Sequence, residues 1–267
     1  MLHSILRSAL EHYLHSTPDF RGKWRILRAF APLIDGIPVR TRFPEVVLTL
    51  AVTDRTNQLC VLGKHEPTVA TAVAKLLPGE CFVDIGANCG LYTIMASKKV
   101  GADGVVISFE PCLQTFLVLE ENLRLNGTKN VHANNCAVSD MPGPAQFDMS
   151  TVGHTGRYAM ALSDSAQASV VDCVRIENGD RFSQYIGNRS TMIKIDVEGF
   201  EVSVLKGIVG LLSRAETHTV VVEVDDKNLR KYGGSAHELY HIMDGFGFVP
   251  STNLRLDEHY DEVFVRS

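Results

Sequence analysis

The stretch CFVDIGANCGLYTIMAS, residues 81–97, carries the strongest fold signal in the chain. An apolar run climbs to Asp84, turn-forming residues follow at Gly86, Asn88 and Gly90, and a helix-like pattern begins at once. A strand, a tight glycine-containing turn and a helix in this order are typical of domains that hold a nucleotide-like cofactor. The stretch therefore predicts a strand, a cofactor-binding turn and a helix.

Strands and helices alternate along the rest of the chain. Apolar runs predict strands and amphipathic patterns predict helices, with strands at 105–109, 131–138, 191–197 and 218–224 and helices at 112–126, 199–213 and 235–244. This alternation is typical of a doubly wound, mostly parallel α/β sheet. The last two apolar runs, GFGFVP and DEVFVRS, have no helix between them, so they predict an antiparallel hairpin at the C-terminal edge.

Residues 1–66 are predicted to form an N-terminal extension, and residues 67–267 the main domain. The extension would contain a helix at about 3–15 and a β-hairpin, in which PEVVLTLAV (44–52) pairs with QLCVLG (58–63). A helix over 67–77 would open the domain. SVVDCVRI (169–176) would add a strand, and the polar region 139–169 shows no helical period.

Composition narrows the function classes. The net charge of −5 over 267 residues argues against a nucleic-acid partner bound by a broad basic face. The basic run RGKWRILR (21–28) is then a solvated or packing face. Six scattered cysteines without a CxxC pair indicate a reducing compartment, and no stretch resembles a signal peptide or a membrane span. We expect a cytoplasmic protein.

The turn excludes two common nucleotide sites. A dinucleotide fold needs G-x-G-x-x-G, but Asn88 and Leu91 occupy the second and third glycine positions, and no phosphate-binding G-x-x-x-x-G-K-[ST] loop is present. What remains is Asp84, the turn itself, and Glu110 at the end of the next predicted strand. Glu110 can accept hydrogen bonds from both hydroxyls of a ribose, while Asp84 can fix the turn or face an ammonium group. S-adenosylmethionine has these features and lacks a pyrophosphate. The alternative is a purely structural role, in which the residues form a tight turn and Asn88 is a helix N-cap.

Four blocks in the same order strengthen this prediction: FVDIGANCGLYTIMAS (82–97), FEPCLQTFLVLEENLRLNG (109–127), NNCAVSD (134–140) and IKIDVEGFEVSVLKG (193–207). They resemble the FkbM family of S-adenosylmethionine-dependent methyltransferases over roughly residues 66–224, and HEP at 65–67 also fits. The resemblance implies a class I methyltransferase Rossmann-like fold that methylates hydroxyls of sugars or polyketide-like natural products. Carried over by position, it assigns cofactor binding to Asp84, Gly86, Asn88, Gly90, Glu110, Asn135, Cys136 and Ala137.

The block IKIDVEG is where we expect the chemistry. Lys194 and Asp196 lie two residues apart on a strand and share a face, Glu198 follows at the strand-to-helix turn, and Glu223 ends the next strand. Because an alcohol is a poor nucleophile until it loses its proton, a base or a metal is expected here. Asp196 or Glu198 would serve as a base; alternatively, Asp196 and Glu223 would hold Mg²⁺. We favour Asp196 in the acceptor site without a metal, with a structural Lys194–Asp196 ion pair as the bland alternative.

The sequence therefore predicts an S-adenosylmethionine-dependent O-methyltransferase acting on a hydroxyl of a sugar, glycolipid or polyketide-like natural product. N-methylation, or cofactor binding without catalysis, are the alternatives. The acceptor would be a small molecule or a glycan, selected by the N-terminal extension and by residues 139–169.

Overall fold

A computed structural model provides the structure of the protein. It describes residues 2–18, 20, 22–23, 25–26, 28–29, 36–49, 55–148, 159–160, 171–256 and 258–267.

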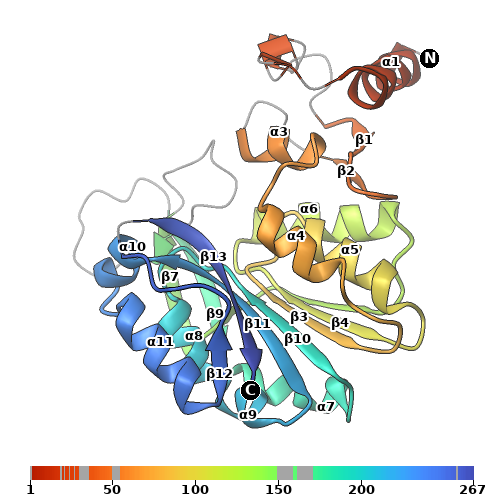
Figure 1. Ribbon diagram of the computed structural model, residues 1–267. Coiled ribbons are helices and arrows are strands. Elements are labelled where there is room, and N and C mark those ends of the chain that lie inside the picture. The colour runs from red at the N-terminus through yellow and green to blue at the C-terminus, as the bar shows by residue number, and fades with distance from the viewer. Residues whose placement is uncertain are drawn as a thin grey trace.

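A seven-stranded sheet forms the centre of the molecule, in the order β12-β13-β11-β10-β3-β4-β5 (Figure 1). Its strands are β3 (Cys81–Ile85), β4 (Val105–Phe109), β5 (Val131–Asn134), β10 (Thr191–Ile195), β11 (Thr217–Asp225), β12 (Phe248–Pro250) and β13 (His259–Arg266). Strand β13 pairs antiparallel with both β11 and β12, and the neighbours from β11 to β5 pair in parallel. The predicted doubly wound sheet with a C-terminal antiparallel hairpin is confirmed.

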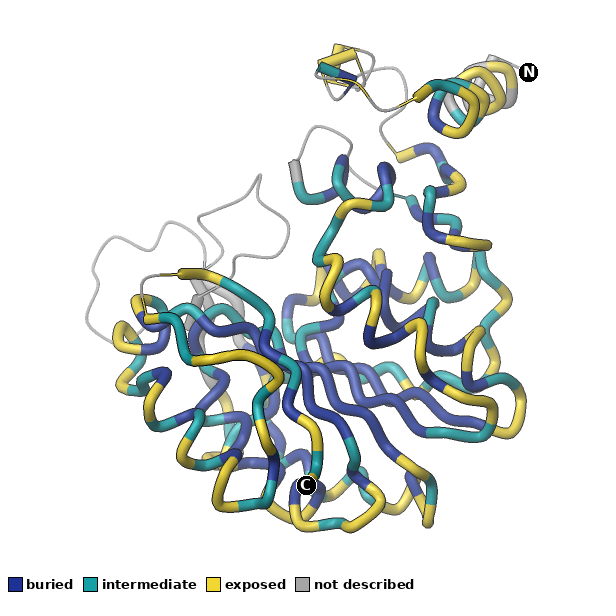
Figure 2. The backbone as a smooth tube through the Cα atoms, viewed as in Figure 1, coloured by how far each residue is buried: buried dark blue, intermediate teal, exposed yellow. Residues whose placement is uncertain are grey.

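Helices cover both faces of this sheet. One face packs against α4 (Pro67–Val73) and α5 (Leu91–Val100), and the other against α8 (Glu201–Gly207), α9 (Val209–Ser213) and α11 (Ala236–Gly245). Every residue of β3, β4 and β10 is buried, so the middle of the sheet is dark in Figure 2. These strands read as continuous apolar runs because a sheet covered on both faces buries alternate side chains on each side.

Several predicted elements are shorter or divided. The helix predicted over 67–77 is α4, which ends at Val73, and the helix predicted over 199–213 is broken between α8 and α9. The strand predicted over 131–138 divides into β5 and β6 (Ala137–Val138), which belong to different sheets. The main domain also contains α6 (Leu113–Leu125), α7 (Ser183–Ile186) and α10 (Asp226–Lys231), with a 3-10 turn at Gly179–Phe182.

A second sheet was not predicted. It has the order β6-β9-β7-β8, with β7 at Gly143–Asp148, β8 at Ala159–Met160 and β9 at Val171–Glu177. The run 169–176 therefore adds its strand here, not to the central sheet. Much of the predicted polar region 139–169 lies outside the described residues.

The predicted N-terminal hairpin is wrong in one strand. Its strands are β1 (Pro38–Arg40) and β2 (Val47–Thr49), whereas QLCVLG belongs mostly to α3 (Arg55–Val61). The buried residues Asn57, Cys60 and Val61 fall at i, i+3 and i+4, which is a helical spacing that the short apolar run concealed. The predicted first helix is present as α1 (Leu2–Ser16).

The extension shares its core with the main domain. Leu14, Val39 and Leu48 belong to the same buried apolar cluster as Ile94 and Val106 of the domain. The division of the chain after residue 66 thus stays a prediction.

Asn122 of α6 and Asn126, the C-cap residue of that helix, attach β2 to the domain. Asn122 accepts a hydrogen bond from the Thr49 N–H (2.7 Å) and donates one to the Cys89 carbonyl (2.8 Å). Asn126 accepts from the Val47 N–H (3.0 Å) and donates to its carbonyl (2.6 Å). Asn122 is fully buried, so its amide replaces water for two backbone groups.

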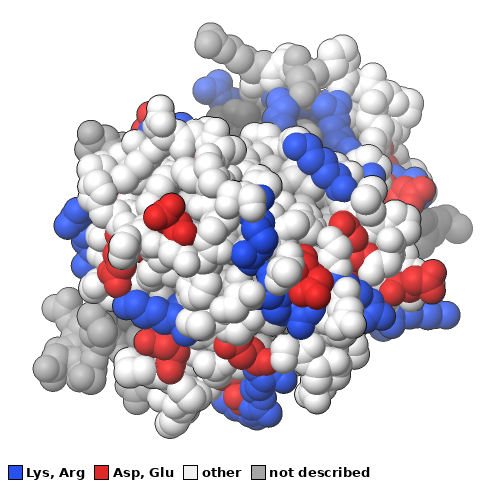
Figure 3. Space-filling view, turned by 60° about the horizontal axis from the view of Figure 1, so that its bottom comes forward, with Lys and Arg blue, Asp and Glu red and all other residues white. Residues whose placement is uncertain are grey.

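The basic run of the extension is at least partly a packing element. Lys23 is 3% exposed, and its ammonium donates to the carbonyls of Leu14 (3.2 Å) and Thr17 (2.8 Å). On the face shown in Figure 3, basic and acidic side chains are interspersed. Within the described part of the chain, no helix has the length and apolar character needed to cross a membrane.

Replacing Asn122 by Ala should lower the free energy of unfolding by about 2–4 kcal/mol, because the Thr49 N–H and the Cys89 carbonyl lose their partner in a buried place. Urea denaturation followed by circular dichroism measures the change. The neighbouring Glu121→Ala, which removes only an exposed ion pair with Arg124, serves as the control and should cost less than about 1 kcal/mol. Equal effects of the two changes would contradict the docking role of Asn122.

Candidate active site

A cavity of about 670 Å³ opens at the carboxyl ends of the central strands. Its wall comes from α3, from the segment before α4, from the loops after β3, β4 and β10, and from β11 and β13. Ligands of open α/β sheets bind at this edge, and the volume lies within the range of small-molecule sites.

The turn after β3 requires glycine at positions 86 and 90 because other parts of the protein pack closely against its backbone. Gly86 has φ +83°, and a Cβ there would lie 1.8 Å from the carbonyl oxygen of Asp196. Gly90 has φ +88°, caps the N-terminus of α5, and has Leu119 2.4 Å from the place of a Cβ. Gly86 lines the cavity and Gly90 does not. Gly90, rather than Asn88, holds the N-cap position.

Asn88 and Glu110 form one hydrogen-bonded unit on the cavity wall. The Asn88 N–H donates to Glu110 Oε2 (3.0 Å), and the Cys112 N–H donates to Glu110 Oε1 (2.9 Å). Asn88 itself has φ 50°, a left-handed conformation that asparagine tolerates better than most residues. Burial raises the pKa of Glu110 to about 7, although the two backbone donors oppose the rise. Glu110 follows β4 directly, as the sequence predicted.

Asp84 does not end its strand, contrary to the sequence-based expectation. It is the fourth residue of β3, is fully buried, and does not line the cavity. Its carboxylate accepts a hydrogen bond from the Thr93 hydroxyl (2.6 Å) and lies 3.6 Å from the Lys194 ammonium. Burial raises the pKa of Asp84, while Lys194 opposes that rise. The ammonium that it faces is therefore one of the protein's own.

Lys194 connects β3, the turn and the loop after β10. Its ammonium lies 3.1 Å from Asp196 Oδ2 and donates to the Gly86 carbonyl at 3.1 Å. The side chain is 3% exposed, and its pKa is raised because the carboxylates of Asp196 and Asp84 outweigh the cost of burial. The ion pair between Lys194 and Asp196 that the sequence suggested is present.

Three residues after β5 were predicted to border the cofactor. Cys136 and Ala137 line the cavity, whereas Asn135 does not. The Asn135 amide instead donates to the carbonyls of Glu110 (2.9 Å) and Pro111 (3.0 Å). Asn135 thus fastens the loop that follows β4.

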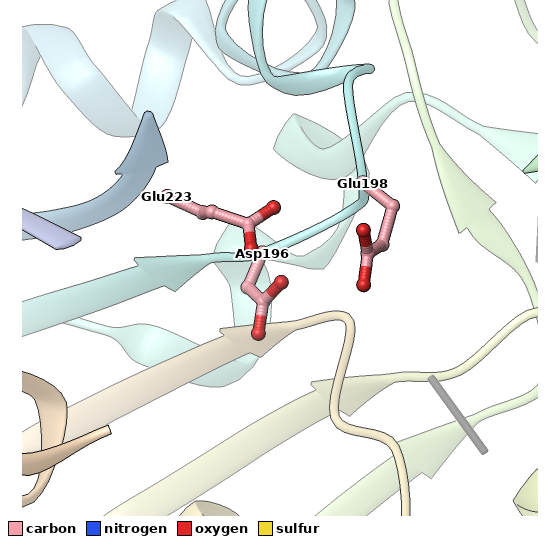
Figure 4. Close-up of side chains that lie close together, drawn as sticks. All are labelled: Asp196, Glu198 and Glu223. Carbon is pink, nitrogen blue, oxygen red and sulfur yellow. The ribbon is translucent and has the colours of Figure 1, made fainter. Parts of the chain in front are cut away.

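Asp196, Glu198 and Glu223 converge on one point of the cavity, with carboxylate oxygens within 4.8 Å of one another (Figure 4). Glu198 has φ 56°, and Glu201 holds the loop by accepting from the Val197 and Gly199 N–H groups (3.1 Å each). Burial and then the charges of Asp196 and Glu198 raise the pKa of Glu223 well above its ordinary value. Glu223 contacts His259 Nε2 at 2.6 Å. The set is a hydrogen-bond-accepting wall that would also suit a hard cation.

Several wall residues had no role assigned from sequence, among them His65, Glu66, Tyr92, His259 and Asp261. His65 and Glu66 belong to the HEP block, which was a signal without a stated role. The β11–β13 pairing sets Asp261 directly opposite Glu223, and burial together with Glu66 and Asp196 raises the pKa of Asp261 to about 7. No local pattern marks His259 or Asp261, because only strand pairing brings them to the cavity.

Comparison with known protein families identifies the family to which the chain belongs. The Methyltransferase FkbM domain matches residues 84–250, which includes both the turn after β3 and the loop after β10. The chain belongs to the FkbM methyltransferase family. Its central sheet has the class I methyltransferase fold, as the resemblance implied.

Three curated relatives are identical to the chain at about a quarter of the aligned residues. Methyltransferase 1 of Beauveria bassiana is 25% identical over 49% of this chain and 59% of its own length. The hexuronic acid methyltransferase AglP of Haloferax volcanii is 29% identical over 55% of this chain and 59% of its own length. The 31-O-demethyl-FK506 methyltransferase FkbM of Streptomyces tacrolimicus is 27% identical over 66% and 75%.

A solved structure, an S-adenosylmethionine-dependent methyltransferase from Aquifex aeolicus, is 16% identical with a TM-score of 0.41, covering 74% of this chain and 87% of that one. The chain spans about three-fifths of the length of the Beauveria and Haloferax relatives.

The wall of this FkbM-family cavity fits S-adenosylmethionine. Asn88 Oδ1 is buried without a hydrogen-bond partner among the residues that the structure describes, so it needs a donor. The Glu110 carboxylate beside it is an acceptor set suited to ribose hydroxyls. The Asp196 carboxylate on the other side suits a positively charged sulfonium.

The Lys194→Met variant of this FkbM domain should be less stable than the wild type by about 3–5 kcal/mol, because two carboxylates lose a buried counter-charge. The folded state raises the pKa of Asp84, so protonation favours folding and the deficit should shrink as pH falls below neutrality. Urea denaturation at pH 5 and pH 8 measures both effects. The double variant Asp84→Asn/Lys194→Met is the control, and it should recover part of the loss at pH 8. A deficit independent of pH and of Asp84 would contradict the pairing.

Proposed function

We propose that the protein is an S-adenosylmethionine-dependent O-methyltransferase that acts on a hydroxyl of a sugar, a glycolipid or a polyketide-like natural product. One observation carries the proposal: the Asn88–Glu110 unit and the carboxylates of Asp196, Glu198 and Glu223 line the same cavity. A donor-binding wall and a hydrogen-bond-accepting wall therefore meet in one space.

The donor side is formed by Asn88, Glu110, Cys136 and Ala137. Glu110 would accept hydrogen bonds from ribose hydroxyls, and Cys136 with Ala137 would border the adenine. S-adenosylmethionine, when bound, supplies an electrophilic methyl group on a sulfonium. Asp84, Gly90 and Asn135 act indirectly, because they shape or fasten the surrounding loops.

The acceptor side aligns the hydroxyl. Lys194 holds Asp196 in place beside the turn, and the Asp196 carboxylate lines the cavity. Glu198 and Glu223 offer further oxygens within 4.8 Å, which suits a polyhydroxylated acceptor. Alignment of this kind removes much of the entropic barrier to a displacement reaction.

The relatives support the acceptor class without fixing it. The Haloferax protein is named for hexuronic acid and the Streptomyces protein for the 31-O position of FK506. A sugar and a polyketide-like compound are therefore both represented among the matches. The match to the Haloferax relative covers 59% of its length, so the acceptor of this chain is our proposal.

We favour an acceptor site that works without a metal. Asp196 already has Lys194 as a counter-charge, and Glu223 has His259 at 2.6 Å. A Mg²⁺ ion held by Asp196 and Glu223 would compete with both partners. N-methylation and cofactor binding without catalysis are less well supported, because neither requires a convergent set of carboxylates.

The wild-type protein should bind S-adenosylhomocysteine, and Glu110→Ala should weaken that binding by about 10- to 100-fold, since about 1.5–3 kcal/mol is typical of a hydrogen bond to a charged group. Isothermal titration calorimetry measures both affinities.

Glu120→Ala removes an exposed carboxylate on α6 and is the matched control, with affinity unchanged. Glu110→Gln, which keeps one oxygen for the backbone donors, guards against a folding effect. Absence of binding by folded wild-type protein would overturn the proposed cofactor.

Asp196→Asn should spare S-adenosylhomocysteine binding and lower kcat by about 10- to 100-fold, because the hydroxyl loses a charge-assisted hydrogen bond. Turnover is measured as S-adenosylhomocysteine release with a panel of methyl glycosides and hydroxylated macrolactones.

Asp225→Asn changes a carboxylate at the end of β11 that does not line the cavity, and it is the matched control. The assay is run with EDTA and with Mg²⁺, and equal rates are expected. Full activity of Asp196→Asn on the best acceptor would contradict its role, and loss of activity in EDTA would favour the metal instead.

A further inference from the structure

His65 and Glu66 form a dyad on the cavity wall. His65 Nε2 lies 2.7 Å from Glu66 Oε1, and the two side chains are 19% and 21% exposed. Both residues line the cavity, on the segment between α3 and α4. A carboxylate bound to one imidazole nitrogen fixes the ring orientation and leaves the other nitrogen to act.

Tyr92 of α5 contacts the dyad through both its hydroxyl and its ring. The hydroxyl donates to the His65 carbonyl (2.9 Å) and contacts the Glu66 carbonyl (3.2 Å). The rings of His65 and Tyr92 stack with centroids 6.1 Å apart. Glu66 has φ 35°, a left-handed conformation that costs a non-glycine residue about 1–3 kcal/mol and persists where the surroundings enforce it.

The second nitrogen of His65 is available. Nδ1 makes no hydrogen bond to any residue in the described ranges, whereas Nε2 is taken by Glu66. The ring is thus anchored at one nitrogen only, on a wall shared with Asp196.

Charged groups from every neighbouring element act on the dyad. They are Glu66 itself, Cys89 and Tyr92 beside the turn and on α5, Lys194 and Asp196 at β10, and His259 and Asp261 of β13. Burial alone would lower the pKa of His65, but the hydrogen bond and charge of Glu66, then Asp196, outweigh it and raise that pKa above its ordinary value. An imidazole whose pKa is raised by a neighbouring carboxylate is a stronger base, which suits proton abstraction.

We propose that His65 is the general base of the reaction and that Glu66 is its positioning residue. The inference rests on the proposed O-methyl transfer and assigns the proton that the acceptor must lose. The acceptor O–H bond would break, with the proton passing to His65 Nδ1 and the electron pair on oxygen forming the bond to the methyl carbon. The methyl–sulfur bond would break at the same time, and its electron pair would stay on sulfur, which leaves as the neutral thioether of S-adenosylhomocysteine. The imidazolium is stabilised by Glu66 and returns the proton to solvent.

The division of labour with Asp196 follows from their partners. Asp196 Oδ2 is committed to the Lys194 ammonium at 3.1 Å, so that oxygen already has a hydrogen-bond partner in the protein. It remains a fixed hydrogen-bond acceptor for the hydroxyl. His65 instead has a partner that strengthens its basicity.

His65→Gln should lower kcat by about 10²- to 10⁴-fold, the usual contribution of a general base, with S-adenosylhomocysteine affinity within about twofold of wild type. In wild type, kcat/KM should rise with pH as His65 loses its proton. Glu66→Gln removes the carboxylate, so the pKa of His65 falls and this limb moves to lower pH. Asp196→Asn should lower the rate and keep the limb, displaced to lower pH by less than in Glu66→Gln because Asp196 contributes less than Glu66 to the raised pKa of His65. His241→Gln, an exposed histidine of α11, is the matched control.

A measurement independent of turnover decides whether the dyad exists. NMR titration of the histidine ring signals, with His65→Gln used for assignment, should show His65 titrating above its ordinary pKa and falling in Glu66→Gln. A His65 pKa unmoved by Glu66→Gln, or wild-type rate in His65→Gln on an acceptor that wild type methylates, overturns the inference. Loss of S-adenosylhomocysteine binding by the wild type would instead overturn the proposed function.

Discussion

The buried ammonium of Lys194 is the interaction on which the cavity depends. It lies 3.6 Å from Asp84, 3.1 Å from Asp196 and 3.1 Å from the Gly86 carbonyl, so one charge joins β3, the turn after it and the loop after β10. A lone ammonium in a sheet covered on both faces would be costly, and so would a lone carboxylate at Asp84, which is fully buried. Each makes the other tolerable. The backbones of the two loops also lie close together, because the Asp196 carbonyl approaches Gly86 so closely that no side chain fits at position 86.

The sequence predicted the parts of the fold that local patterns determine. Continuous apolar runs identified β3, β4, β10 and β11, and the missing helix between the last two strands identified the antiparallel edge. Failures came where tertiary partners decide. The run QLCVLG is apolar enough for a strand, but its buried positions follow a helical spacing. Ala137 and Val138 leave the central sheet because Ile176 and Glu177, far along the chain, pair with them.

The candidate site divides in the same way. Glu110 and Asp196 could be predicted because each directly follows the last residue of a strand, at the edge of the sheet where the cavity lies. Asn88 could be predicted because it lies in the glycine-containing turn after β3. Asp84, Gly90 and Asn135 were placed in the right neighbourhood, yet their contacts are with the protein. His259 and Asp261 could not be predicted, since the register of β13 on β11 places them opposite Asp225 and Glu223. Sequence spacing contains no information on that register.

That register also explains the electrostatic character of the acceptor side. Glu223 and Asp261 face each other directly across two strands, an arrangement that destabilises a sheet when both are charged. Burial and neighbouring carboxylates raise the pKa of both, so the fold relieves the repulsion by favouring their protonated forms. Asp196 instead has the Lys194 ammonium 3.1 Å away. Glu66 has His65, and the hydrogen bond and charge of His65 lower the pKa of Glu66 despite its burial. The carboxylates of the cavity therefore fall into two groups. Asp196 and Glu66 each lie beside a basic partner, whereas burial and neighbouring carboxylates favour the protonated forms of Asp261 and of Glu223, even with His259 2.6 Å from Glu223.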